Sequence, residues 1–344
     1  DIIMPTELLN QSVQHNCNIA DAKHAANFTL CTYLMKMREY CRWDNGYSLT
    51  HVLVKEEIGE WVSKREALWE DIEQQDYMPL NIDDQHYDPF ETEQINTKLL
   101  PLGLVYSGGL GTHRVPHFFL AKLEAQYEYA DHRVIVSNVE YARDLTAPPA
   151  MTLGDTIFIR KQSIRRMLWE KAQEWNWHKI ENAMSKAFSY YPFDNDIEAA
   201  LDAMTADELE SILLHEKGEI ETSNILGDDW KTLLAEVTDA RVELMLRTIK
   251  DLYADSCVTL PKLIESNNAA SLHFFAGNMT ALRKDLCPSF VTTYQAWCKG
   301  ASLENFSAWV LRAQQHWHEL IKELLARQTC EAEVLAEVIE AARF

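Results

Sequence analysis

The sequence is poor in basic residues. It has 32 Lys and Arg against 53 Asp and Glu among 344 residues, which gives a formal net charge of −21 at pH 7. Binding to nucleic acid or to an anionic membrane surface requires a concentrated positive surface. The charge balance therefore argues against both, and we expect no direct nucleic-acid partner and no membrane partner.

The sequence also lacks long apolar runs and paired cysteine motifs. Its least charged stretch, residues 266–282, contains Asn267, Asn268 and Asn278 and cannot sit in lipid. The seven cysteines are widely spaced and include no C-x-x-C, unlike a secreted disulfide framework or a zinc knuckle. We interpret them as reduced thiols, which predicts a cytoplasmic protein. A hydrophobic content of 47% excludes a wholly disordered chain.

Helical periodicity dominates the first part, residues 1–98. Apolar residues at three-and-four spacing predict one helix from Ile19 to Trp43, ended by Asn45-Gly46, and a second helix over residues 50–75. Residues 71–97 contain eight acids, no Lys or Arg, and two prolines. This composition predicts a solvated acidic loop.

Residues 99–160 form the only part with a mixed pattern. We predict strands at 102–106, 134–136 and 156–159, a glycine-rich turn at 107–112, and a helix that Pro116 opens and that runs to about Gln126. A small sheet of two to four strands follows from these segments. The remaining part, 161–344, is predicted to be a C-terminal helical domain, so the fold class is mainly α, bundle-like, with an inserted β-sheet element (α+β).

Two of the predicted C-terminal helices carry most of the acids that we consider as candidate site residues. Thr205 and Glu208 have the spacing of a capping box, which predicts a helix from there to about Ser223. Gly227 separates it from a long helix over residues 228–258. On these helices several carboxylates fall inside or beside the apolar stripe, where an isolated charge is too costly unless it is paired, protonated or metal-bound.

Ionisable groups of this kind lie on three predicted helix faces. In the 205–223 helix, Glu216 is central in the apolar stripe, with His215 and Glu219 beside it. In the 228–258 helix, Asp251 and Asp255 share a face with Arg241, and in the first helix His24 and Glu39 share a face. Carboxylate and imidazole ligands from facing helices build di-iron and di-manganese sites. The candidate metal ligands, for iron, manganese or zinc, are therefore His215, Glu219, Asp251, Asp255, His24 and Glu39; the catalytic candidates are Glu216 and Arg241.

A structural explanation of the same acids stays open. Arg38, Arg42 and Arg241 are suited by their fork geometry to neutralise buried carboxylates. The first hypothesis is thus a buried carboxylate/histidine site for a metal or small ligand, in a metal-dependent enzyme if it is catalytic. The alternative is a non-catalytic acidic helical protein that forms a homo-oligomer or binds a protein partner.

The glycine-rich turn offers a separate anion site. Its backbone N–H groups could cradle an anion, and basic side chains stand next to it, which makes Gly109, Gly111, His113 and Arg114 candidate ligands. It lacks the sequence of a phosphate-binding P-loop or a dinucleotide fingerprint. A tight structural turn is the favoured explanation, and the anion site is the alternative. A predicted strand is followed directly by Glu140, Arg143 and Asp144. Their side chains are explained either by a functional role or by an ion pair.

Several phrases occur together in a recognisable set. They are NCNIADA at 16–22, YSGG at 106–109, EYARDL at 140–145, LHEKGE at 214–219, and DLYAD at 251–255 before TLP at 259–261. The set resembles an uncharacterised family of bacterial proteins of similar length, and the likeness runs through most of the chain. The resemblance implies a bacterial cytosolic protein. It implies no activity, cofactor or catalytic residue.

Overall fold

The computed structural model describes residues 6–111, 114–178 and 180–344. The chain divides into two compact units, residues 1–173 and 174–344, with the boundary inside α5 (Lys161–His178). Helices dominate, and strands occur only in the first unit of the described chain. The predicted fold class, mainly α with an inserted β element, is therefore confirmed.

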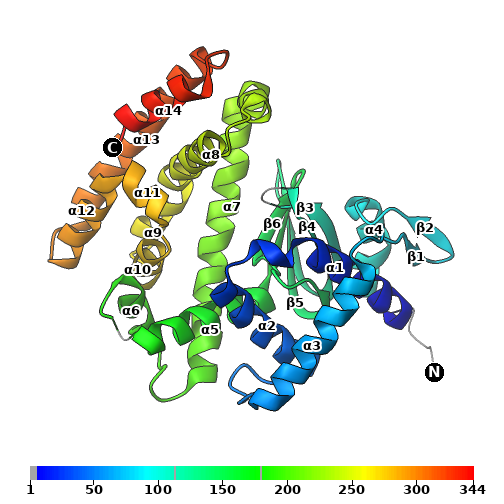
Figure 1. Ribbon diagram of the computed structural model, residues 1–344. Coiled ribbons are helices and arrows are strands. Elements are labelled where there is room, and N and C mark those ends of the chain that lie inside the picture. Colours follow the sequence, from blue (N-terminus) through cyan, green and yellow to red (C-terminus); the bar gives the residue numbers. More distant parts are fainter. Residues whose placement is uncertain (1–5, 112–113, 179) are drawn as a thin grey trace. The chain divides into compact units, whose positions relative to one another are not determined.

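The first unit combines helices with two sheets (Figure 1). Its elements up to α5 are α1 (Thr6–His24), η1 (Ala25–Asn27), α2 (Leu30–Asp44), α3 (Lys55–Ile72), β1 (Leu80–Ile82), β2 (Gln85–Tyr87), α4 (Thr92–Leu99), η2 (Leu100–Leu102), β3 (Leu104–Leu110), β4 (Pro116–Glu128), β5 (Arg133–Arg143), β6 (Ala150–Leu153) and β7 (Thr156–Arg160). The acidic segment predicted as a loop thus contains a hairpin, β1–β2, and most of α4.

The predicted helix over residues 19–43 is two helices. The chain leaves helical geometry after η1 and re-enters it at α2, where the Thr29 hydroxyl accepts a hydrogen bond from the Thr32 N–H. A side chain that bonds the backbone in this way favours a helix start over a helix interior. The end of α2 at Asn45-Gly46 is as predicted, with Gly46 in the left-handed region at φ +67°.

The larger sheet has the order β3-β4-β5-β7-β6. All neighbours are antiparallel except β5 and β7. The helix predicted at Pro116 is wrong, because this segment is β4. Its side chains alternate: Phe118 and Leu120 pack in one cluster, and Phe119 and Ala121 in another, which is the period of a strand buried on both faces.

One face of this sheet is covered by α1. Leu9, Val13 and Cys17, four residues apart, form one stripe that packs with Phe118 and Leu120. Burial of such side chains stabilises the fold by about 1.5–3 kcal/mol each. The contact fixes the C-terminal turn of α1 near the start of β4.

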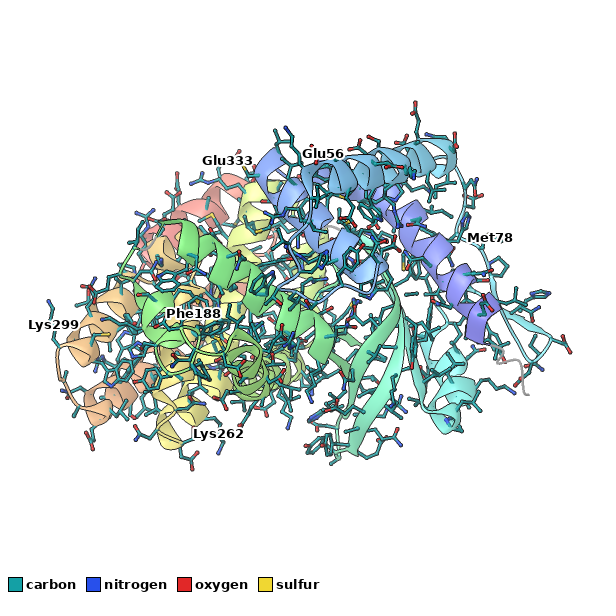
Figure 2. All side chains as sticks on the ribbon, turned by 90° about the horizontal axis from the view of Figure 1, so that it is seen from below. Glu56, Met78, Phe188, Lys262, Lys299 and Glu333 are labelled. Carbon is teal, nitrogen blue, oxygen red and sulfur yellow. The ribbon has the colours of Figure 1, made fainter. Side chains whose placement is uncertain are left out.

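The second unit is helical throughout its described residues. Its elements are α6 (Ala183–Phe188), α7 (Ile197–Glu236), α8 (Ala240–Ala254), the π-helical η4 (Asp255–Thr259), α9 (Leu260–Glu265), α10 (Ala269–Gly277), α11 (Ala281–Leu286), α12 (Pro288–Cys298), α13 (Leu303–Ala326) and α14 (Ala332–Ala341). A single apolar core joins eight of these helices, α7 to α14. In Figure 2, Phe188 is buried, whereas charged side chains such as Lys262 and Glu333 are exposed.

The helix starts differ from those predicted. Asp196 caps α7 by accepting from the Ala199 N–H, so Thr205 and Glu208 lie inside the helix and form no capping box. Gly227 is non-helical, at φ +67° and ψ −157°, and separates two helical parts of α7, as predicted. The chain turns again before α8, which Asp239 caps, so the predicted 228–258 helix is interrupted. None of the helices, over the residues described, is long and apolar enough to cross a membrane.

Candidate active site

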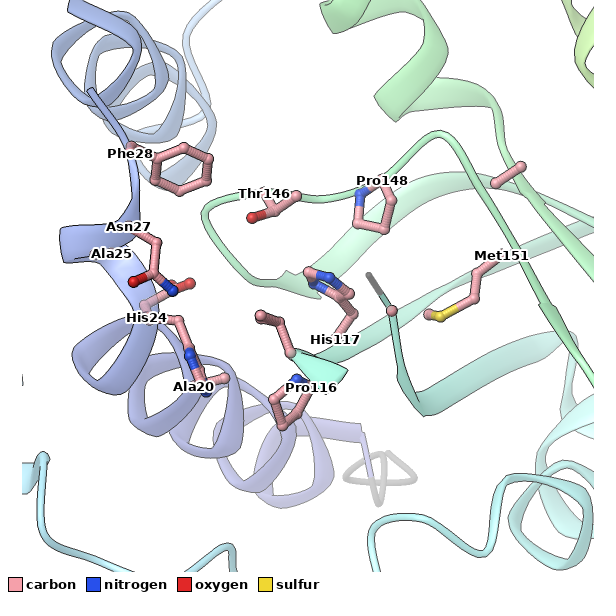
Figure 3. Close-up of a pocket in the computed structure, with 14 residues that line it drawn as sticks. Ala20, His24, Ala25, Asn27, Phe28, Pro116, His117, Thr146, Pro148 and Met151 are labelled. Atoms are coloured by element: carbon pink, nitrogen blue, oxygen red, sulfur yellow. The ribbon is translucent and has the colours of Figure 1, made fainter. Parts of the chain in front are cut away.

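A cavity of about 630 Å³ lies in the first unit, between the end of α1 and the start of β4. This volume suits a small organic molecule. Figure 3 shows His24 on one side of the cavity, and His117 and Met151 on the other. Most lining side chains are apolar, and the ionisable ones are Asp21, His24 and His117.

His117 and Asp144 form a hydrogen-bonded pair at this cavity. Because β4 and β5 are antiparallel, with Phe119 opposite Arg143, the first residues of β4 lie beside those that follow β5. His117 Nδ1 is 3.2 Å from Asp144 Oδ2. An ionised carboxylate only accepts hydrogen bonds, so Nδ1 donates, and whenever the imidazole is neutral Nε2 carries the lone pair. Within the described chain, Nε2 has no hydrogen-bond partner of its own.

Asp21 meets the same segment from α1. Both of its carboxyl oxygens accept from the Leu145 N–H, at 2.9 and 3.0 Å. Burial and the negative charge of Asp144 raise the pKa of Asp21 well above its usual value. The cavity therefore contains a carboxyl group that gives up its proton less readily than an ordinary aspartic acid.

Asp144 behaves in the opposite way. Burial acts to raise its pKa, but the charge and hydrogen bond of His117, the charge of Arg160 and the Ala147 N–H lower the pKa well below its usual value. Two carboxyl groups whose pKa values are driven apart are a recurrent basis for assigning an acid and a base. Here burial and charge shift the pKa of Asp21 upward, and the charges and hydrogen bonds that oppose burial shift that of Asp144 downward.

The loop of residues 144–147 is fixed on both sides. Its N–H groups bond the two carboxyl groups, while Arg143 donates to its first two carbonyl oxygens and Arg166 to its last two, at 2.8–3.1 Å. Ala147 has φ +39°, a left-handed conformation that is costly for a residue with a Cβ. Four charge-assisted hydrogen bonds hold this strained loop, so the positions of Asp21 and His117 are set in advance.

The two candidates from the first helix have separate places. His24 lines the cavity, and burial, His117 and Lys23 lower its pKa, so it is neutral at pH 7. Glu39 is absent from the cavity and forms a buried ion pair with Arg42. Arg42 thus pairs with the Glu39 carboxylate, as the structural explanation of the buried acids predicted.

The candidate anion site is not an open turn. Gly109 pairs with His117 across β3 and β4, and the Gly111 N–H donates to the Val115 carbonyl at 2.8 Å. These backbone groups belong to a hairpin, so Gly109 and Gly111, the two described glycines among the candidates, do not form an open cradle of N–H groups. Arg114 is exposed, and His113 lies outside the described residues.

In the second unit, His215 and Asp255 meet beside a smaller cavity of about 200 Å³. His215 Nδ1 is 2.8 Å from one oxygen of Asp255, and Arg283 pairs with the other. Burial opposes it, but the charge and hydrogen bond of Asp255 raise the pKa of His215 to about 10. A cationic imidazole has no lone pair for a metal ion or a proton.

The other second-unit candidates also bond to cations. Glu219 lies 2.8 Å from Lys250 and 3.9 Å from His215 Nε2. Burial and a hydrogen bond with Glu219 raise the pKa of Asp251 to about 8. Across the described ranges, no three His, Cys, Asp or Glu side chains are placed so that they could hold a metal ion. The six metal candidates also divide between the two units, four here and two in the first.

Neither of the two catalytic candidates lines the smaller cavity. Glu216 is partly buried but does not line the smaller cavity. Arg241 is exposed and pairs with Glu340, not with Asp251 or Asp255. The predicted 228–258 helix placed Arg241 on the acids' face, but the chain turns before α8, and Arg241 lies in the first turn of the new helix.

The fold and the site define a two-unit, mainly helical protein with a His–Asp pair in a cavity of its sheet-containing unit. Residues 8–160 match the N-terminal domain, and residues 165–343 the C-terminal domain, of a family described as "Family of unknown function (DUF6866)". The chain belongs to this family, which confirms the resemblance to an uncharacterised one. No curated protein and no solved structure matches the chain.

Proposed function

We propose that the protein is an enzyme that performs general acid–base chemistry on a small polar organic molecule in the 630 Å³ cavity. His117 acts as the general base and Asp21 as the general acid. The observation that carries the proposal is the hydrogen bond from His117 Nδ1 to Asp144, which leaves the Nε2 lone pair at a cavity that also contains a carboxyl group with a raised pKa.

The proposed reaction moves one proton in and one proton out. His117 Nε2 takes a proton from a bound hydroxyl group, water or acidic C–H, and the imidazolium that forms is stabilised by ionised Asp144. Asp21 gives its proton to the oxygen on which negative charge develops. Asp144 is a positioning residue, because it acts on the substrate only through the imidazole.

The test is turnover of a panel of small esters, amides, hydroxy acids and enolisable carbonyl compounds by the full chain. We expect His117→Gln to slow any substrate that the wild type turns over by about 10²–10⁴-fold, the usual contribution of a positioned base. His86→Gln, an exposed histidine of β2, is the matched control and should leave turnover unchanged. Turnover of no panel member, or equal turnover by His117→Gln, would overturn the proposal.

Asp144 needs a readout that a purely structural role would not move. Nitrogen-15 NMR of the imidazole should show wild-type His117 as the neutral tautomer protonated at Nδ1. Asp144→Asn should shift the tautomer population and lower kcat with little change in KM.

Elemental analysis of the same protein tests the hypothesis that it binds iron, manganese or zinc. One or two equivalents of such a metal per chain would support that hypothesis.

We further propose that the protein works in the reducing cytoplasm of a bacterium. All seven cysteines are free thiols, and burial raises the pKa of the Cys17 thiol well above its usual value, which suits an inert buried group. The family resemblance supports the bacterial assignment. The ligand that we propose for the cavity is a small molecule. The net charge of −21 argues against a direct nucleic-acid partner.

A further inference from the structure

The smaller cavity, in the second unit, has one apolar and one polar side. Ile212, Leu263, Phe274 and Phe275 supply apolar lining. The polar side includes Glu208, Ser211, His215, Asp255, Ser271 and Arg283. At about 200 Å³, the cavity is smaller than the sites of drug-sized ligands and accommodates only a compact molecule.

Glu208 is the least expected member of this lining. Its side chain is fully buried inside α7, where the sequence pattern had indicated a cap. Oε1 accepts a hydrogen bond from the Ser271 hydroxyl at 2.8 Å, but Oε2 has no hydrogen-bond partner within the described ranges. Burial raises the pKa of Glu208 to about 7, against the effect of the Ser271 and Ser211 hydroxyls. A buried, unsatisfied carboxyl oxygen requires an explanation.

Arg283 brings a second unsatisfied group to the same cavity. One of its terminal nitrogens pairs with Asp255, while its buried Nε has no hydrogen-bond partner in the described structure. Among the side chains that line the cavity, His215 and Arg283 carry two positive charges against one on Asp255. When Glu208 is protonated, this lining keeps one excess positive charge.

We propose that this cavity is a second ligand site, specific for a small carboxylate with an apolar body. A carboxylate only accepts hydrogen bonds, so it can take one from Arg283 Nε and one from the protonated Glu208 oxygen. Its charge complements the excess positive charge, and its hydrocarbon part packs against Phe274 and Phe275. A neutral ligand of the same shape would leave the charge unmatched.

The π-helical segment η4 supplies the carboxylate of the site. Asp255, the first residue of η4, reaches His215 of α7 and Arg283 of α11, and the Thr259 hydroxyl donates to the same carboxylate at 2.8 Å. Single π turns within helices occur often at functional sites. All lining residues belong to the second unit, so this site is independent of the proposed chemistry at His117.

The test is calorimetric titration of the full chain with benzoate at pH 6, with benzyl alcohol as the neutral ligand of similar shape. We expect saturable binding of benzoate and at least tenfold weaker binding of benzyl alcohol. Arg283→Lys keeps a cation beside Asp255 but removes the Nε donor, and should weaken benzoate binding at least tenfold. His117→Gln should bind benzoate as the wild type does, which separates this proposal from the first.

The pH dependence tests the role of Glu208. The charged and titratable groups around it are Asp207 and His215 on α7, Tyr191, Asp255 in η4 and Arg283 on α11. Benzoate binding to the wild type should weaken about tenfold per pH unit above pH 7, because the proton is lost. Glu208→Gln keeps a permanent N–H donor there, so it should bind benzoate with nearly equal affinity at pH 6 and pH 8. Asp251, with a pKa of about 8, is unchanged in this variant.

Three results would overturn the proposal. One is the absence of saturable benzoate binding at pH 6. Another is equal affinity for benzyl alcohol, which would mark a merely apolar cavity. The third is benzoate binding whose affinity Arg283→Lys leaves unchanged and whose pH dependence Glu208→Gln leaves unchanged. This result would place the ligand elsewhere.

Discussion

Gly111 lies against the imidazole ring of His117. A Cβ atom at position 111 would come within 2.6 Å of the ring's Cδ2 and 2.8 Å of Nε2, both far inside van der Waals contact. The same ring holds the 3.2 Å contact with Asp144. A side chain at position 111 would thus force the ring or the backbone of residue 111 to shift.

Gly111→Ala should therefore impair the site more than the fold. The added methyl group displaces the His117 ring, so turnover should fall at least tenfold, and the NMR tautomer population of His117 should change. Gly59→Ala is the matched control, because nothing lies within 4 Å of that Cβ and Gly59 is in a helix. It should stabilise the protein by up to about 1 kcal/mol and leave turnover unchanged. Equal activity of both variants would contradict the assigned contact.

The sequence identified some parts of the first-unit site without their arrangement. His24 stood out as a histidine on an apolar helix face, and Asp144 as an acid just after a predicted strand. Proline at a strand start and at a helix start gives the same local signal, so β4 was predicted as a helix. That error hid the pairing that brings His117 to Asp144.

Asp21→Asn should increase stability while it reduces turnover. The pKa of Asp21 is higher in the folded chain than in the unfolded chain, so its ionisation destabilises the fold as the pH rises above about 4. Asparagine removes this effect and still offers an oxygen to the Leu145 N–H. The free energy of unfolding of the variant, relative to the wild type, should therefore increase from pH 5 to pH 8, by at most about 1.4 kcal/mol per pH unit.

Chemical denaturation at both pH values measures this difference. Asp71→Asn, at an exposed aspartate of α3, is the control and should follow the wild type at each pH. An Asp21→Asn variant whose relative stability is the same at pH 5 and pH 8 would show that Asp21 is ionised as easily in the folded chain as in the unfolded one.

The Glu140–Arg160 ion pair should be among the most sensitive contacts of the first unit. Arg160 Nε is 2.9 Å from Glu140 Oε1, both side chains are about 1% exposed, and the Ser163 hydroxyl donates to the same oxygen. Removal of one member of a buried pair leaves the other charge uncompensated, so Arg160→Met should cost about 3–5 kcal/mol. Urea unfolding, in the transition of the first unit, measures this loss.

An exposed ion pair provides the comparison. Lys64 and Glu60 are 2.6 Å apart, but both are largely exposed, so Lys64→Met should change the unfolding free energy by less than about 1 kcal/mol. Similar losses for Lys64→Met and Arg160→Met would mean that burial does not set the strength of the Glu140 contact.

In the second unit, the sequence located the acids in the apolar stripes but did not reveal which groups they pair with. The sequence singled out His215, Glu219, Asp251 and Asp255, and these do lie near one another. Their partners, Lys250 and Arg283, come from α8 and α11, and no periodicity in one helix reveals the charge that another helix supplies. Glu208 was missed because its spacing from Thr205 matched a capping box.

Stability of the second unit should fall as the pH rises from about 6.5 towards 10. The folded pKa of His215, about 10, lies above its unfolded value near 6.5, so the His215–Asp255 contact contributes fully below the unfolded value and is lost as the pH passes the folded one. Because the His215 side chain is 34% exposed, solvent screening limits the size of the effect. His215→Gln keeps Asp255 paired with Arg283 and removes the titration, so thermal unfolding at pH 6, 8 and 10 should show a stability gap between wild type and variant that narrows with pH. His86→Gln, in the first unit, should keep the wild-type profile. A gap that stays constant or widens would mean that His215 is neutral at pH 7, and its lone pair would then be available to a ligand.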